Sequence, residues 1–246
     1  VISPWNFPLL LSLLDSLAAL VAGSAVVVKP SEVTPRFVAP LQRLIDASPE
    51  LSPVFRFVIG DGSIGAELIN NVDTVCFTGS VRTGKKVAAA AAENMIPAHL
   101  ELGGKDPGYV MEDANLDAAV ETLIDGAMFN SGQCCCGIER IYVHESLFDQ
   151  FVEKAVEIVN GYKLGNPLDQ ETTIGPMAHV RFADEVRHQI TDAIAAGAVA
   201  HINPVDFPED IGAYLMPQIL SNVTHDMRVM REESFGPVVG IMSVKD

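Results

Sequence analysis

Hydrophobic residues along the chain alternate between helical spacing and short continuous apolar runs. In the first hundred residues, helical spacing predicts helices over residues 9–22, 35–47, 66–70 and 81–93. Between them, the pattern predicts strands at residues 25–28, 55–59, 74–78 and 99–102. The continuous apolar run at 25–28 is typical of a strand buried on both faces, and the strand at 74–78 is also expected to be buried. Thr34 followed by Pro35 is typical of a helix N-terminus, with the threonine as N-cap.

The remainder of the chain repeats this alternation. Helices are expected at residues 116–129, 147–160 and 182–196, and strands at 109–110, 140–143 and within 214–244. Repeated alternation of strand and helix predicts an α/β protein whose parallel sheets are covered by helices on both faces. The Gly103-Gly104 pair is the expected hinge between two α/β units.

The leucine-rich segment 9–23 has a composition that could be mistaken for a membrane span. It is too short to cross about 30 Å of hydrocarbon, and Asp15 interrupts it. No basic region precedes it, which argues against a signal peptide. The sequence therefore predicts a buried helix here, and no membrane association.

Composition narrows the classes of partner. The chain has 246 residues and a formal net charge of −16, which argues against binding to nucleic acids or anionic membranes. Three of its four cysteines are consecutive, a pattern that does not build a disulfide framework and that favours a reducing compartment, the cytoplasm. Because the chain starts at Val1 and stops soon after an apolar run, we expect a fragment of a longer protein.

Two glycine loops are candidates for phosphate binding. Gly60-x-Gly62-x-x-Gly65 fits the dinucleotide fingerprint, but lysines stand about twenty positions on, where an acidic residue would hold a ribose. A plain glycine turn is an equally good interpretation. The second loop, residues 77–84, joins a buried strand to a helix whose free N–H groups would suit a pyrophosphate.

Three further features are candidates for chemistry. The adjacent cysteines 134–136 lack the spacing of a zinc site and the histidines show no metal pattern, so no metal is expected; the thiols are either small buried groups or include a nucleophile. Glu101, between leucines at a strand end, is expected to be buried with a raised pKa suited to a general base, or to be ion-paired with a lysine. Asn6 is either a turn residue or a functional amide.

Six motifs occur in a fixed order, and together they resemble the NAD(P)-dependent aldehyde dehydrogenase superfamily over the whole chain. They are Pro4-Trp5-Asn6-Phe7-Pro8, Lys29-Pro30-Ser31-Glu32, Phe77-Thr78-Gly79-Ser80, Glu101-Leu102-Gly103-Gly104-Lys105, Gly132-Gln133-Cys134-Cys135 and Glu233-Ser234-Phe235-Gly236-Pro237. The resemblance implies a partial, Rossmann-like NAD-binding domain over residues 1–103. It implies a partial α/β catalytic domain over residues 104–246.

The resemblance also implies catalytic roles. Cys135 matches the nucleophile, Glu101 the general base, and Asn6 the side-chain donor of the oxyanion hole. Cys134 and Cys136 flank the nucleophile and would line the substrate tunnel. If residues 9–22 are a helix, an apolar face would line the tunnel or simply belong to the core; its members are Phe7, Leu11 and Leu14.

Cofactor contacts follow in the same way. Lys29 and Glu32 match groups at the adenine-side ribose, and Gly79 and Ser80 match the pyrophosphate loop, with Trp5 nearby. The contacts at the nicotinamide end match Glu233 and Phe235. A carboxylate at the ribose hydroxyls would repel a 2′-phosphate, so Glu32 favours NAD over NADP.

The implied reaction oxidises an aldehyde to a carboxylic acid with NAD, through a thiohemiacetal and a thioester on Cys135. Water activated by Glu101 would hydrolyse the thioester, because transfer to coenzyme A needs no such base. A coenzyme A-acylating enzyme and a catalytically silent binding or structural protein are the alternatives. The expected substrate is a small neutral aldehyde, and the family resemblance implies a homo-oligomer for the full-length protein.

Overall fold

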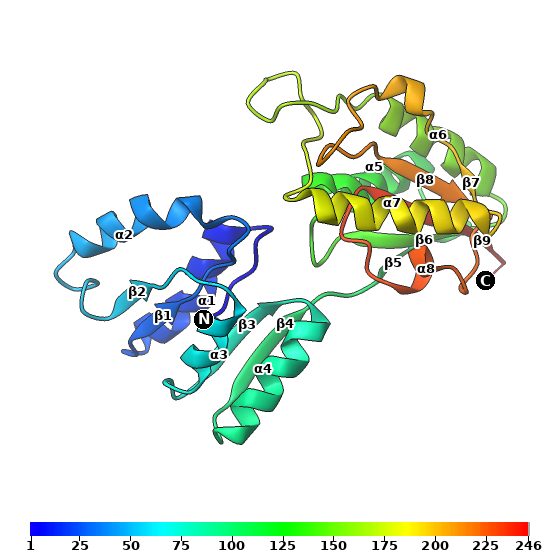
Figure 1. Ribbon diagram of the computed structural model, residues 1–246. Helices are drawn as coiled ribbons and strands as arrows, with labels where there is room; N and C mark the ends of the chain where they lie inside the picture. The colour runs from blue at the N-terminus through cyan, green and yellow to red at the C-terminus, as the bar shows by residue number, and fades with distance from the viewer. Residues whose placement is uncertain (246) are drawn as a thin grey trace. The chain divides into compact units, whose positions relative to one another are not determined.

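The computed structural model describes residues 1–245, which divide into two compact units. The first unit is Val1–Gly103 and the second begins at Gly104 (Figure 1). The α/β class with parallel strands predicted from the sequence is confirmed. The cofactor and catalytic roles of the two units stay predictions.

The first unit contains two short parallel sheets joined by the N-terminal segment. Strand β1 pairs with β2, and β3 pairs with β4. Ile2 makes parallel bridges to both Lys29, after β1, and Phe77 in β3, so residues 1–3 lie between the two sheets. The elements are α1 (Pro8–Val21), β1 (Val26–Val28), η1 (Pro35–Phe37), α2 (Val38–Asp46), β2 (Phe55–Phe57), α3 (Gly62–Ile69), β3 (Val75–Gly79), α4 (Val81–Glu93) and β4 (Ala98–Leu102).

Two expected helix starts differ in detail from the structure. Thr34 is the N-cap residue and Pro35 the first helical residue, as expected, but the first turn is a 3₁₀ turn, and the Thr34 hydroxyl donates to the Trp5 carbonyl at 3.0 Å and makes no cap hydrogen bond. Helix α3 begins at Gly62 instead of residue 66, because Asp61 accepts a hydrogen bond from the Ser63 backbone and acts as N-cap. The glycine loop after β2 is correspondingly shorter.

The prediction that residues 9–22 form a buried helix is wrong in its packing. Leu10, Leu14 and Leu17 are exposed, whereas Ser12 and Ser16 are fully buried. The Ser12 hydroxyl lies 2.6 Å from that of Ser3, and the Ser16 hydroxyl donates to the Ser12 carbonyl. Apolar residues surround most of this helix, so periodicity could not identify the inward face; paired small hydroxyls let the helix approach the N-terminal segment closely.

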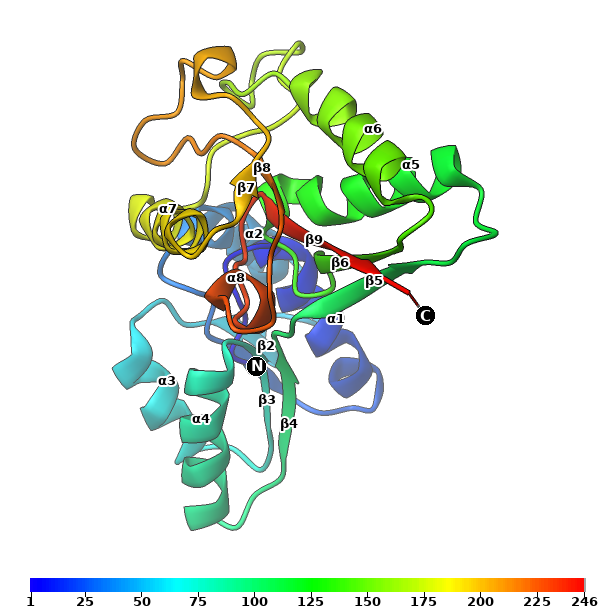
Figure 2. The same cartoon turned by 90° about the vertical axis from the view of Figure 1, so that its right-hand side faces the viewer.

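The second unit is one mixed five-stranded sheet with helices on both faces. The strand order is β5-β6-β9-β8-β7, and only β7 runs antiparallel to its neighbour. Helices α5 and α6 cover one face, and α7 and α8 cover the other (Figure 2). The elements are β5 (Asp106–Val110), α5 (Leu116–Met128), η2 (Phe129–Gly132), β6 (Ile138–His144), α6 (Phe148–Asn160), α7 (Val180–Ala195), β7 (Val199–Ala200), η3 (Pro204–Asp206), β8 (Gln218–Ser221), α8 (Arg228–Arg231) and β9 (Val238–Val244).

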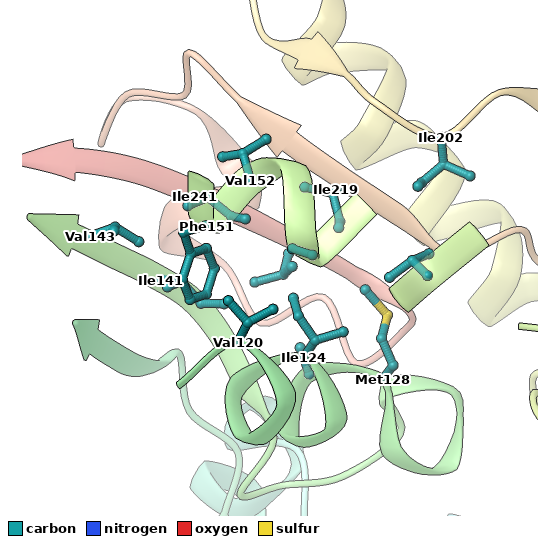
Figure 3. Close-up of a cluster of buried hydrophobic side chains, with 14 of the residues drawn as sticks. Val120, Ile124, Met128, Ile141, Val143, Phe151, Val152, Ile202, Ile219 and Ile241 are labelled. Atoms are coloured by element: carbon teal, nitrogen blue, oxygen red, sulfur yellow. The ribbon is translucent and has the colours of Figure 1, made fainter. Parts of the chain in front are cut away.

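The largest core cluster of this unit lies between the sheet and helices α5 and α6 (Figure 3). Phe151 on α6 is fully buried against Ile124 on α5 and against Ile141 and Ile241 on the sheet. Burial of large apolar side chains is the main contribution to the stability of such a unit. This core anchors the strands whose ends carry the loops described below.

Truncation of this core should destabilise the second unit. We expect Phe151→Ala to reduce the free energy of unfolding by about 3–5 kcal/mol, because it removes a buried ring and leaves a cavity. Leu168→Ala is the control, since that side chain is 88% exposed and should change stability by less than about 0.5 kcal/mol. Urea titration monitored by circular dichroism measures both; equal stabilities would contradict this account of the core.

Candidate active site

The cysteine-bearing loop follows α5 and contains three consecutive residues in left-handed conformation. The φ angles of Asn130, Ser131 and Gly132 are +53°, +57° and +70°. Such angles cost energy in residues other than glycine, so the surrounding structure must hold them. The Ser131 hydroxyl donates to the Gly175 carbonyl at 2.8 Å, which ties the loop to the segment before α7.

The buried side chain of Gln133 holds this loop through two hydrogen bonds to the backbone. Its side-chain amide donates to the Asn130 carbonyl at 2.9 Å, and its carbonyl oxygen accepts from the Ala178 backbone at 2.7 Å. Gln133 is only 4% exposed, so these bonds satisfy a buried amide that would otherwise be costly. The loop conformation directly before Cys134 and Cys135 is thereby fixed.

A second loop, residues 233–237, lies directly against the first. An added Cβ on Gly132 would overlap the backbone carbonyl of Gly236, so the two loops are in backbone contact. Phe235, next to this contact, has a φ of +52°. Both loops precede strands of the same sheet, β6 and β9, and therefore meet at its amino-terminal edge.

A buried carboxylate holds the second loop. Glu139 on β6 accepts the backbone N–H of Ser234 at 2.9 Å on one oxygen and that of Phe235 at 3.0 Å on the other. Lys105 donates to the same carboxylate at 2.6 Å and to the Ser234 hydroxyl at 3.0 Å. The Ser234 hydroxyl in turn donates to Gln189 on α7.

The three adjacent thiols have different environments. Cys134 is buried and its sulfur lies 3.4 Å from that of Cys136, whereas Cys135 and Cys136 are exposed. Burial raises the pKa of Cys134 to about 11. Partial burial of Cys135, together with the neighbouring Cys136 and Glu233, also raises the pKa of the Cys135 thiol, which lowers the fraction present as thiolate at a given pH.

Glu233 is half-buried beside this site. Burial raises the pKa of its carboxyl group, and the nearby charge of Glu139 adds to the effect, while a hydrogen bond from the Gly104 backbone opposes it. A carboxylate here disfavours the Cys135 thiolate by charge repulsion. The expected thiol and nicotinamide-end residues are therefore brought together within the second unit.

The remaining candidates gather at one edge of the first unit's parallel strands. Trp5 and Asn6 follow the N-terminal segment, Lys29 and Glu32 follow β1, and Ser80 follows Gly79 at the end of β3. Carboxyl ends of parallel strands are the usual ligand-binding edge of α/β sheets. The topology of the first unit therefore brings these candidate residues to the same edge of its parallel strands.

The donor set at this edge suits a dinucleotide. Lys29 is buried and its ammonium lies 3.2 Å from the Glu32 carboxylate, which is 54% exposed. Ser80 is the N-cap of α4, a helix with no acidic residue in its first turn. A carboxylate suits ribose hydroxyls, and a helix N-terminus suits a pyrophosphate. Gly60 lies against Ile64, where an added Cβ would clash, so this turn needs a glycine with or without a cofactor beside it.

The expectation that Glu101 is buried is wrong for this chain. In β4 the residues alternate between half-buried and exposed, and Glu101 is on the exposed face with His99. Leu100 and Leu102, on the opposite face, pack with the core cluster that includes Phe77. Two-residue periodicity therefore directs the carboxylate away from this core.

The expected tunnel residues lie at the start of α1. Phe7 is the N-cap residue and its carbonyl accepts from the Leu11 backbone at 3.0 Å. Phe7 and Leu11 are half-buried, and Leu14 is 56% exposed. The first unit alone therefore does not enclose an apolar tunnel around them.

Sequence reasoning missed the residues that hold the second loop, namely Lys105 as an ion-pair partner, Glu139 and Gln189. A signal for Glu139 existed, since it is the one carboxylate within the strand-forming segment 138–144. Across residues 1–245, no three side chains of the metal-ligating types come together as a metal site. No helix among the same residues has the length and hydrophobicity needed to span a bilayer.

The first unit has the organisation of Rossmann-like α/β domains, and the second presents a thiol on a tightly held loop. The profile described as "Aldehyde dehydrogenase family" matches residues 1–246, and the chain belongs to this family. Lactaldehyde dehydrogenase of Escherichia coli is 37% identical over 98% of the chain. Aldehyde dehydrogenase 1A1 of Rattus norvegicus is 40% identical over 99% of the chain.

Solved structures agree with this membership. The crystal structure of an NAD-dependent aldehyde dehydrogenase from Sinorhizobium meliloti matches with a TM-score of 0.94 and 36% identity, over 100% of this chain and 49% of that one. The structure of lactaldehyde dehydrogenase from E. coli also matches with a TM-score of 0.94, and the match covers 52% of its length. The chain spans about half the length of the curated relatives it matches, with 51% and 49% of the two relatives named above.

The contact between the two loops predicts the cost of a side chain at residue 132. Gly132→Ala should reduce the free energy of unfolding by about 3 kcal/mol or more, because the added Cβ brings both backbone strain at positive φ and overlap with the Gly236 carbonyl. Gly197→Ala is the matched control: its φ is +103° but nothing lies within 4 Å of the added carbon, so strain alone should cost about 1–2 kcal/mol. Chemical denaturation compares them; equal losses would contradict the loop contact.

The raised pKa of Cys135 predicts its reactivity. Because only the thiolate reacts, the rate of alkylation by iodoacetamide should keep increasing with pH beyond the range of an ordinary thiol. Glu233→Gln removes a repelling charge, so it should lower this pKa and increase the rate at pH 8. Glu232→Gln, whose carboxylate instead pairs with Arg228, is the control. Peptide mass spectrometry locates the adduct. A pH–rate profile whose midpoint lies below the pKa of an ordinary thiol would refute the prediction.

Proposed function

We propose that the protein containing this chain oxidises a small aldehyde to a carboxylic acid with NAD, using Cys135 as nucleophile. The observation that carries the proposal is the position of Cys135. It is an exposed thiol directly after a strained loop that Gln133 and Ser131 hold in place, in a chain of the aldehyde dehydrogenase family. Strained, over-determined loops are typical of functional sites.

In this proposal the Cys135 sulfur adds to the aldehyde carbon and forms a thiohemiacetal. The side chain of Asn6 and the Cys135 backbone N–H stabilise its oxyanion, and one such donor contributes roughly 3–4 kcal/mol in comparable sites. Bound NAD supplies the acceptor for hydride. Loss of hydride from the thiohemiacetal carbon leaves a thioester on Cys135.

Glu101 completes the cycle in this proposal. It takes a proton from water, the resulting hydroxide adds to the thioester carbon, and the C–S bond breaks to release the carboxylic acid and the Cys135 thiolate. Protonated Glu101 then returns its proton to the sulfur, which restores the carboxylate and the thiol. The exposure of Glu101 on the open face of β4 supports access to water. Acid formation by hydrolysis is therefore favoured over transfer of the acyl group to coenzyme A, and a silent binding protein would need none of these three side chains.

For the cofactor, Lys29 and Glu32 would hold the adenine-side ribose, and Gly79 and Ser80 the pyrophosphate, with Trp5 nearby. Glu233 and Phe235 would contact the nicotinamide end. The exposed Glu32 carboxylate supports NAD over NADP, because it would repel a 2′-phosphate. The NAD-dependent relative from S. meliloti is consistent with this choice.

The substrate we propose is a neutral aliphatic or aromatic aldehyde. Phe7, Leu11, Leu14, Cys134 and Cys136 would line its path, and none of these side chains is cationic. The proposed assembly is a homo-oligomer of the full-length protein. The proposed compartment is the cytoplasm, from the cysteine pattern of the sequence.

Separate variants test the nucleophile and the base. Cys135→Ser should abolish NADH formation, whereas Cys76→Ser should retain it. Glu101→Gln should leave thioester formation but lower acid release by about 10²–10⁴-fold, because it removes the base. Glu93→Gln, an exposed carboxylate on α4, is the control.

Absorbance at 340 nm and product analysis with and without coenzyme A measure these effects. Full activity in Cys135→Ser would overturn the mechanism. Formation of acyl-coenzyme A in place of acid would favour the acylating alternative.

A further inference from the structure

The Glu139 carboxylate is unusual because it is a buried charge that binds mainly backbone. Its side chain and that of Lys105 are each only 7% exposed, and their charged atoms lie 2.6 Å apart. Burial lowers the pKa of Lys105, and Glu139 opposes this effect. A buried ion pair contributes little net stability compared with apolar residues of the same size, so its geometry is the more informative property.

That geometry is directed at residues 233–235. One oxygen of Glu139 accepts the Phe235 N–H; the other accepts the Ser234 N–H and the Lys105 ammonium. Gln189 adds a third support, because its amide donates to the Glu233 carbonyl at 3.3 Å while its oxygen accepts from the Ser234 hydroxyl. Three consecutive residues of the loop are thus held by one buried network.

The held loop is strained, so it needs this support. Phe235 has a positive φ although it is not a glycine, a conformation that persists only when neighbouring contacts impose it. Gly236, the next residue, lies against Gly132 of the cysteine loop. The conformation of residues 233–235 therefore depends on Glu139 on one side and on the cysteine loop on the other.

We propose that Glu139 is a positioning residue that, with Lys105, fixes the loop presenting Glu233 and Phe235 to the nicotinamide end of the cofactor. This inference rests on the proposed function, in which those two side chains contact NAD. Glu139 itself touches neither cofactor nor substrate. Its effect is transmitted through the two backbone N–H groups that it binds.

Glu139→Gln is the sharpest test because it keeps the shape of the side chain. Whichever way the new amide turns, its NH₂ group faces a backbone N–H, that of Ser234 or that of Phe235, so one bond is lost. We expect the Kd for NAD, measured by calorimetry, to increase at least about fivefold. We expect kcat for aldehyde oxidation to fall by about 10²-fold, as for a small misplacement of reacting groups.

Two further readouts separate positioning from general destabilisation. Hydrogen exchange of the Ser234 and Phe235 amides should accelerate in Glu139→Gln. The rate at which p-nitrophenyl acetate acylates Cys135, a reaction that uses no NAD, should stay within about twofold of the rate in the unsubstituted protein. The control is Val159→Ala, which shortens a fully buried side chain on α6 in the same unit. It should lower the stability of the unit without accelerating exchange of the Ser234 and Phe235 amides.

The possible failures are distinguishable. If the unsubstituted protein binds NAD and oxidises aldehydes, but Glu139→Gln changes the Kd and kcat no more than Val159→Ala does, the positioning role is wrong. If the unsubstituted protein neither binds NAD nor oxidises any aldehyde, the proposed function fails, and this role toward the cofactor fails with it.

Discussion

The contact between the backbones of Gly132 and Gly236 is the constraint on which the candidate active site depends. It requires a residue without a side chain at position 132, and it brings the cysteine loop against the loop of residues 233–237. Neither loop has a relaxed conformation, since Asn130, Ser131 and Phe235 all have positive φ. Buried polar groups compensate: Gln133 holds the first loop and Glu139 the second. Both supporting side chains are buried inside the second unit.

The two units contribute to the proposed chemistry from opposite kinds of sheet edge. In the first, the candidate cofactor residues follow the carboxyl ends of parallel strands, the edge at which α/β sheets usually bind ligands. In the second, both loops precede strands β6 and β9 and lie at the amino-terminal edge. The thiol chemistry that we propose therefore depends on loops stabilised by side-chain networks, and the cofactor binding depends on strand ends and a helix N-terminus.

Much of the fold could be predicted from the sequence. Helix α4 was predicted with its observed bounds, and the apolar strands were found within a few residues, because hydrophobic periodicity and turn residues are local signals.

The inward face of α1 could not be predicted, since leucines surround it and the pairing of its serine with Ser3 is a tertiary effect. The exposure of Glu101 follows from strand alternation, which the flanking leucines in fact indicated. Lys105 and Glu139 are 34 positions apart, so no local pattern revealed their pairing. The roles of Cys135, Asn6 and the cofactor residues came from motif resemblance and stay predictions.

Capture of the acyl group on the enzyme would show whether Cys135 carries the reaction. The Glu101→Gln protein would be incubated with a small aldehyde and NAD, quenched in acid, digested and analysed by mass spectrometry. We expect the mass of the corresponding acyl group on Cys135, with Cys134 and Cys136 unmodified and no adduct when NAD is omitted. An acyl group on another residue, or NADH formation with Cys135 never acylated, would contradict the claim that Cys135 carries the reaction.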